Sequence, residues 1–137
     1  MTVLLVDMAN TVGSRPDGWW RDRAGATNRL LTRLARLPGA ELTGPDGAPV
    51  AISALVAVVE GRSRDVPAPA DLRVVRAEGS GDDALVAAAS ELVGATAAGL
   101  LVVTADRELR GRLPARARTA GPGWLLAAVD RLEALDS

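Results

Sequence analysis

VLLVDMAN at residues 3–10 is the segment on which the expected fold depends. Residues 3–6 form an uninterrupted apolar run, and Asp7 ends it. Such a run is typical of a strand buried on both faces of a sheet. In open sheets of parallel strands, ligands bind beyond the carboxyl ends of the strands. The segment therefore indicates an α/β fold with Asp7 at the edge where ligands bind.

The rest of the chain alternates apolar runs with amphipathic patterns. Further strands are expected at 52–59, 72–75, 100–103 and 116–120. Helices are expected at 19–37, 82–93, 106–113 and 124–135. The segment TGPDGAP at 43–49 is interpreted as a turn. The alternation predicts a mostly parallel sheet of four to five strands with helices on both faces, which is a three-layer α/β/α arrangement.

The composition limits the chemistry that the chain can perform. Its 137 residues carry a formal net charge of -1 and fit a single domain, residues 1–137. Cys and His are absent, and all 16 basic residues are arginine. These absences exclude a Ser-His-Asp triad, a thiolate nucleophile, a zinc site of the usual ligands, a lysine phosphate loop and a Schiff base. The remaining side chains favour hydrolysis by carboxylates that hold a hard divalent cation.

No segment has the pattern of a secretory signal or a membrane span. The apolar start lacks a preceding basic region, and Asp7 interrupts it. No stretch approaches the roughly 20 apolar residues of a transmembrane helix. We therefore expect a cytoplasmic location without membrane attachment.

Carboxylates follow several of the expected strands. They are Asp7, with the amide Asn10 close behind it, then Glu60, the pair Asp82 and Asp83, and Asp106. Acids that meet at one sheet edge repel one another, and Mg²⁺ or Mn²⁺ relieves this repulsion. A cation held in this way polarises a phosphodiester and lowers the pKa of a bound water. The pattern predicts a metal site at the carboxyl edge of the sheet.

Two other interpretations of these residues stay open. Ser80-Gly81-Asp82-Asp83 fits a helix capping box, Asp106 fits an N-cap, and Asp7 fits a side chain that binds loop amides. Gly79–Ala84 also fits the G-x-G-x-x-A form of the dinucleotide fingerprint. In that case the chain is a nucleotide-binding domain, although two Asp side chains at the helix start repel a pyrophosphate.

Three segments together resemble the NYN branch of PIN-like nucleases, and most closely its YacP-like subgroup. They are Asp7-x-x-Asn10, the helix start GDDALVAA at 81–88, and TADREL at 104–109. The subgroup shows D-x-x-N, A-D-D and T-S-D-R-E-L in the same order. Departures are Met8 and Ala9 after the first Asp, and Gly81 in place of Ala before the paired acids.

The resemblance implies a PIN-like (Rossmann-like) domain that binds Mg²⁺ or Mn²⁺ and cleaves RNA. Carried over by position, the metal-binding and catalytic residues are Asp7, Asp83 and Asp106. The implied supporting residues are Asn10, Glu60, Ser80, Asp82 and Thr104. A non-catalytic RNA-binding or protein-binding module of the same fold stays open as an alternative.

Basic residues gather in two segments on either side of an acidic centre. Residues 15–36 contain six arginines against two aspartates, and residues 107–118 contain five arginines against one glutamate. This division suits the RNA partner that the resemblance implies, because phosphates need attraction to a site whose own acids repel them. Ordinary solvated surface charge stays open as an alternative. The candidate RNA-binding residues are Arg15, Trp19, Trp20, Arg21, Arg23, Arg107 and Arg110. Association with the ribosome and formation of a homodimer are both compatible with the sequence.

Overall fold

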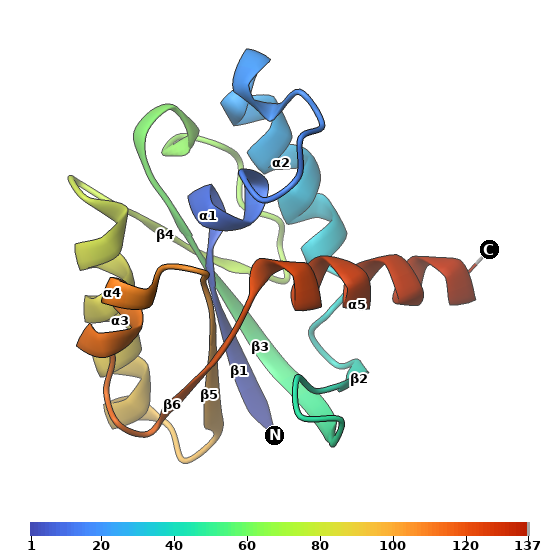
Figure 1. Ribbon diagram of the computed structural model, residues 1–137, viewed down its shortest axis with the longest axis vertical. Helices are drawn as coiled ribbons and strands as arrows, with labels where there is room; N and C mark the ends of the chain where they lie inside the picture. The colour runs from blue at the N-terminus through green and yellow to red at the C-terminus, as the bar shows by residue number, and fades with distance from the viewer. Residues whose placement is uncertain (137) are drawn as a thin grey trace.

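The computed structural model describes residues 1–136, which form a mixed sheet between two layers of helices (Figure 1). Its strands are β1 (Thr2–Asp7), β2 (Glu41–Thr43), β3 (Pro49–Val59), β4 (Arg73–Arg76), β5 (Gly99–Val103) and β6 (Ala117–Ala120). The parallel strands follow the order β4-β3-β1-β5-β6. The short β2 pairs antiparallel with the start of β3. The expected mostly parallel sheet is confirmed, with six strands rather than four to five.

Helices cover both faces of this sheet. They are α1 (Met8–Val12), α2 (Arg23–Leu34), α3 (Gly81–Ala95), α4 (Arg107–Arg112) and α5 (Pro122–Leu135), with single 3₁₀ turns η1 (Trp19–Arg21) and η2 (Gly61–Ser63). The helices α3 and α4 lie on one face, and α1, α2 and α5 lie on the other (Figure 1). The three-layer α/β/α arrangement is therefore confirmed.

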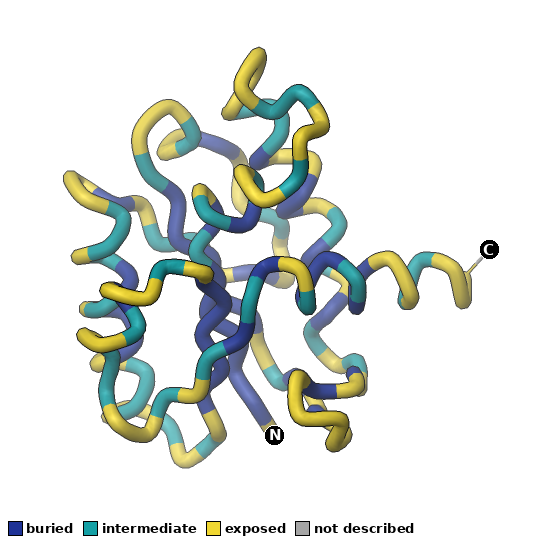
Figure 2. Tube along the Cα trace, in the orientation of Figure 1, coloured by how far each residue is buried: buried dark blue, intermediate teal, exposed yellow. Residues whose placement is uncertain are grey.

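Alternation along the central strand explains why helices lie on both faces. Val3 and Leu5 of β1 pack toward α3, whereas Leu4 and Val6 pack toward α2 and α5. All four side chains are buried. Figure 2 shows the same pattern, with the buried trace concentrated in the middle strands. An apolar run in β1 is thus required by two cores, one on each side.

Two local expectations are corrected by the structure. The helix expected at 19–37 begins at Arg23, because Asp22 has non-helical backbone angles and its Oδ1 accepts the Gly25 N–H at 2.9 Å. The two tryptophans therefore lie in η1, ahead of the helix. The segment before the 43–49 turn contains β2, whose Leu42 is buried against β3. A three-residue edge strand is too short for periodicity to reveal it.

The strand order reverses beside β1. The chain adds β3 and β4 on one side of β1 and then crosses to add β5 and β6 on the other. The carboxyl ends of β1 and β5 are therefore neighbours at the switch point where ligands bind in such sheets. No helix within residues 1–136 combines the length and the apolar character needed to cross a membrane.

Candidate functional site

Asp7 ends β1 and is the most enclosed acid at the carboxyl edge of the sheet. Its Oδ1 accepts the Asn10 N–H at 3.2 Å, and its Oδ2 accepts the Thr104 hydroxyl at 3.2 Å. Burial raises the pKa of Asp7, while the hydrogen bonds from Asn10 and Thr104 oppose this rise. The charges of Asp82 and Glu60 raise the pKa further. Asp7 is therefore a carboxylate under electrostatic strain from burial and from neighbouring acids.

Thr104 joins Asp7 to Asp106 across the switch point. The Thr104 side chain is fully buried at the end of β5, and its hydroxyl also accepts the Asp106 N–H at 3.2 Å. Asp106 in turn accepts the Leu109 N–H at 3.1 Å through Oδ1 and caps α4. The interpretation of Asp106 as an N-cap is confirmed, and Asp7 caps α1 in the same way. Both acids thus have a structural role at this edge.

Two further contacts fix the loop between β5 and α4. The Asn10 Oδ1 accepts the Ala105 N–H at 2.8 Å, which ties α1 to the loop. The Arg110 Nη2 donates to the Thr104 carbonyl at 2.8 Å, with Nε adding a longer bond at 3.3 Å. Asn10 and Thr104 therefore hold the two candidate acids, whereas Arg110 holds the backbone that carries one of them.

Glu60 occupies the start of α3, where the sequence suggested a capping box. The Glu60 Oε2 accepts the Gly81 N–H at 2.6 Å. Within residues 1–136, the Ser80 side chain accepts no hydrogen bond from the first amides of α3, so the capping-box interpretation is wrong. A Cβ at Gly81 would collide with the Glu60 carboxylate. A pyrophosphate needs these helix amides, so the bound carboxylate also disfavours the dinucleotide interpretation.

The paired acids of α3 have different surroundings. Asp83 has a side chain that is 73% exposed, and its Oδ1 forms an ion pair with Arg112 Nη2 at 2.7 Å. Asp82 is half-buried, and its charge acts on Asp7. The charge of Asp82 therefore acts on Asp7, whereas the family resemblance gives the metal-binding role to Asp83. Helical geometry gives the reason, because Asp82 lies one turn before the buried Leu85 and shares its face.

The donor set at this edge suits a divalent cation. Asp7 and Asp106 lie at the ends of adjacent parallel strands, as expected. The charges of Glu60 and Asp82 both act on the Asp7 carboxylate. These oxygen ligands are the type that Mg²⁺ and Mn²⁺ prefer. Within residues 1–136, no three acidic side chains lie close enough together to hold a metal ion. Convergence of Asp7, Asp83 and Asp106 at ligating distance is therefore absent from this arrangement.

A cavity of about 290 Å³ opens directly beside the acids. Glu60, Trp19 and Arg23 all line it. The Thr27 and Ser63 hydroxyls, which also line it, are hydrogen-bonded to each other at 2.8 Å. The cavity therefore offers an aromatic ring, a guanidinium and hydroxyl groups next to the acidic edge.

The two tryptophans differ in exposure. Trp20 is 53% exposed, while Trp19 is half-buried and lines the cavity. The Arg23 guanidinium lies 5.0 Å from the Trp19 ring centroid, and that of Arg21 lies 5.8 Å from the Trp20 ring. The rings meet edge to face with centroids 5.9 Å apart. This arrangement keeps both aromatic and cationic groups together at η1.

The other candidate RNA-binding arginines have different surroundings. Arg107 is exposed at the first turn of α4. Arg15 forms an ion pair with an acid of α5, and Arg110 binds the carbonyl at the end of β5. Of these three, Arg107 and Arg15 lie where a nucleic acid can reach them, and Arg110 is a positioning residue.

The fold is similar to that of Rae1 (YacP) from Bacillus subtilis. One crystal structure of that protein aligns with a TM-score of 0.70 and 20% identity, covering 98% of this chain and 76% of that chain. A crystal structure of a point mutant of the same protein aligns with a TM-score of 0.66 and 20% identity, covering 96% and 76% of the two chains. No protein-family model and no curated protein matches the sequence. This likeness shows the shared fold and confirms the fold that the YacP-like resemblance implied.

Proposed function

We propose that this protein is an Mg²⁺- or Mn²⁺-dependent endoribonuclease that works on RNA in the cytoplasm. The observation that carries the proposal is the cluster at the β1–β5 switch point, where Thr104 joins Asp7 to the Asp106 backbone. Glu60 and Asp82 add negative charge to this cluster. A buried hydroxyl that links two partly buried acids at a ligand-binding edge is more typical of a functional site than of a solvated surface.

Asp7, Asp82 and Asp106 are the acids that would hold the cation, with Glu60 beside them. The bound cation would polarise a phosphodiester and lower the pKa of a water molecule. Asn10 and Thr104 orient the two Asp7 oxygens, as their hydrogen bonds require. Asp83 lies outside this set, because it is exposed and paired with Arg112.

RNA is the substrate class that the surroundings of the site favour. The cavity beside Glu60 presents Trp19 for stacking and Arg23 for a phosphate or base. Arg21 in η1 and Arg107 at the start of α4 add exposed positive charge. These groups attract a polyanion to an edge whose own acids need a cation to accept it.

The adjacent acids of α3 provide a matched test of this assignment. Labelled single-stranded RNA is incubated with Mn²⁺, or with chelator, and the wild type is compared with Asp82→Asn and Asp83→Asn. Both variants remove one negative charge from the same helix turn. We expect cleavage by the wild type only with metal, a loss of about a hundredfold or more in Asp82→Asn, and near-normal cleavage in Asp83→Asn. Equal activity in the two variants would refute the role of Asp82.

A non-catalytic module of this fold is the second candidate. It is favoured by the capping roles of Asp7 and Asp106 and by the lack of three grouped acids within residues 1–136. The same samples decide between the two. RNA binding without cleavage in Mn²⁺, together with no heat of Mn²⁺ binding by calorimetry, would support the module and contradict the nuclease.

A further inference from the structure

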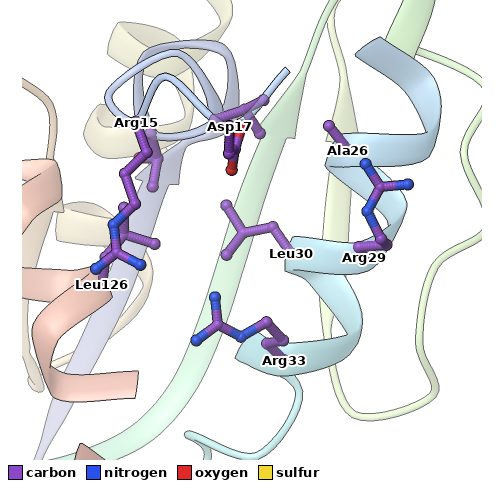
Figure 3. A pocket seen from close by; sticks show the side chains of 9 residues that line it. Arg15, Asp17, Ala26, Arg29, Leu30, Arg33 and Leu126 are labelled. Atoms are coloured by element: carbon purple, nitrogen blue, oxygen red, sulfur yellow. The ribbon is translucent and has the colours of Figure 1, made fainter. Parts of the chain in front are cut away.

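A second cavity of about 200 Å³ is lined by residues of α1, α2, α5 and the loop that follows α1 (Figure 3). Its polar lining consists of Thr11, Arg15, Asp17, Arg29 and Arg33. Leu30 and Leu126 form its apolar floor. Val12 lines this cavity and the one beside Glu60, so the two share a wall.

Two of the arginines are held in place by acids of α5. Asp130 bridges them, with its Oδ2 at 2.9 Å from Arg15 Nη2 and its Oδ1 at 2.6 Å from Arg33 Nη2. The Arg33 Nε also contacts Glu133 at 2.5 Å. Because a guanidinium has five N–H donors, both arginines keep donors beyond these bonds. The α5 acids therefore fix two cationic forks at the rim of the cavity.

Arg29 supplies a third cation, which forms no direct ion pair within residues 1–136. It lines the cavity from α2. Figure 3 shows Arg29, Arg15 and Arg33 around Leu30, with Asp17 above it. Asp17 is the only acid in the described lining. The lining thus has more positive than negative groups, while Asp130 and Glu133 lie behind two of them.

Thr11 gives an independent indication of a ligand. The residue is 1% exposed, and its hydroxyl is the buried side-chain polar atom that has no hydrogen-bond partner within residues 1–136. Such an atom is unfavourable unless something in the adjoining space bonds to it. Thr11 lies four residues after Asp7 along α1, which is about 6 Å of helix rise. The cavity is therefore close to the acidic edge, about one helical turn away along α1.

We propose that this cavity binds a phosphodiester of the RNA strand next to the one at the acidic edge. The inference rests on the proposed function for the identity of the strand. Arg15, Arg29 and Arg33 would donate hydrogen bonds to the phosphate oxygens. The Thr11 hydroxyl, which also lines the cavity, would donate a further hydrogen bond to the phosphate. Asp17 makes a single negative charge more suitable than the near-double charge of a terminal phosphate. The apolar floor is suited to the adjoining ribose.

Opposite changes of charge in the lining test the proposal. Binding of a labelled RNA oligonucleotide without terminal phosphates is measured by fluorescence anisotropy in chelator, where cleavage cannot occur. We expect Arg29→Gln to weaken binding about fivefold and to reduce the salt slope by about one. Asp17→Asn should tighten binding. Arg36→Gln, which removes the same charge outside the cavity, should leave binding nearly unchanged.

Thr11→Val separates a ligand contact from a structural role. Replacing an unpartnered buried hydroxyl with a methyl group should leave the melting temperature unchanged or higher, while RNA binding weakens. If the hydroxyl is only part of the packing, the variant binds RNA as the wild type does. That result would contradict the proposed contact.

Two results would overturn the phosphodiester site. One is Arg29→Gln binding RNA as tightly as Arg36→Gln. The other is an effect of Arg29 that appears only when the oligonucleotide carries a 5′- or 3′-terminal phosphate, which would indicate an end-binding site. Cleavage of RNA by the wild type is assayed separately with Mn²⁺. A wild type that binds and cleaves while Arg29→Gln does the same defeats this inference and leaves the nuclease intact.

Discussion

Thr104→Val removes one hydroxyl that serves both candidate acids at the switch point. In the wild type this hydroxyl donates to Asp7 Oδ2 and accepts the Asp106 N–H, each at 3.2 Å. Valine has nearly the same shape, so the buried packing is kept. The variant therefore isolates the two hydrogen bonds from the rest of the β5 terminus.

The expected loss of stability follows from these two bonds. A hydrogen bond to an ionised group contributes about 1.5–3 kcal/mol, and an unpaired N–H adds a penalty of about 1 kcal/mol. Water reaches the half-buried Asp7 and replaces part of the lost hydrogen-bond energy. We therefore expect a net loss of about 2 kcal/mol in the free energy of unfolding near pH 7. At about 4 °C per kcal/mol for a chain of this length, the melting temperature should fall by about 8 °C.

The loss should also depend on pH, because the lost bond stabilises the charged form of Asp7. Burial raises the folded-state pKa of Asp7, so its contribution to stability falls as pH rises from the unfolded pKa of about 3.9 through the folded pKa. The Thr104 hydroxyl lowers that pKa, and its removal makes the fall larger. The difference between Thr104→Val and the wild type should therefore be small at acid pH and greatest at neutral pH.

Urea unfolding at several pH values, followed by circular dichroism, measures both quantities. Thr104→Ser is the matched control, because it keeps the hydroxyl and loses only a methyl group, at a cost of about 1 kcal/mol that does not change with pH. A Thr104→Val variant as stable as the wild type at neutral pH would refute the reasoning. A loss that is equal at acid and neutral pH would show that Asp7 is not the acceptor.

Further predictions concern acids, arginines and tryptophans around the same edge. Asp7→Asn keeps a capping oxygen but removes the destabilised charge. Calorimetry should therefore show a higher melting temperature than the wild type at neutral pH, and Mn²⁺ should no longer raise it. The exposed cap variant Asp22→Asn should not melt higher than the wild type and should still be stabilised by Mn²⁺. Arg110→Gln should lower stability by about 1–2 kcal/mol in urea, with no change in the salt slope of RNA binding. Trp19→Ala should weaken RNA binding about tenfold in anisotropy measurements, and Trp20→Ala much less, since only Trp19 lines the described cavity.

The sheet was predictable because its central strands are apolar on both faces. The pattern at residues 3–6 requires two cores, and the structure places alternate side chains of β1 in each. The positions of Asp7 and Asp106 at adjacent strand ends follow from the same pattern, since parallel strands end at one edge. These predictions depend on local periodicity, which the sequence states directly.

The helical periodicity of α3 also indicates which of the two adjacent acids, Asp82 or Asp83, lies on its buried side. Successive helix residues are rotated by about 100°, so two adjacent acids cannot face the same way. Leu85, Ala88 and Ala89 define the buried face of α3, and Asp82 lies one turn before Leu85. The helix pattern therefore places Asp82, rather than Asp83, on the buried side of α3.

The role of Glu60 could not be inferred from local sequence. Its carboxylate accepts the N–H of Gly81, 21 residues away, at the first position of α3, while Ser80 makes no side-chain capping bond within residues 1–136. Such a contact depends on how the end of β3 lies against the start of α3. The arginine-lined cavity beside α1 is of the same kind, because it forms only when α2 and α5 pack together.

Capping explains where Asp7 is but not how it is surrounded. Asp22 caps α2 through one accepted N–H while its side chain stays exposed, so a cap in this chain requires no burial. Asp7 caps α1 with one oxygen, but it is also partly buried, bonded to Thr104 and acted on by Asp82 and Glu60. Burial and like charges both destabilise an ionised carboxylate, and the capping bond from Asn10 offsets these costs only in part, because the pKa of Asp7 is still raised. A cation bound to Asp7 would recover both, which is why the surroundings of this acid, rather than its position at a helix start, support a metal site.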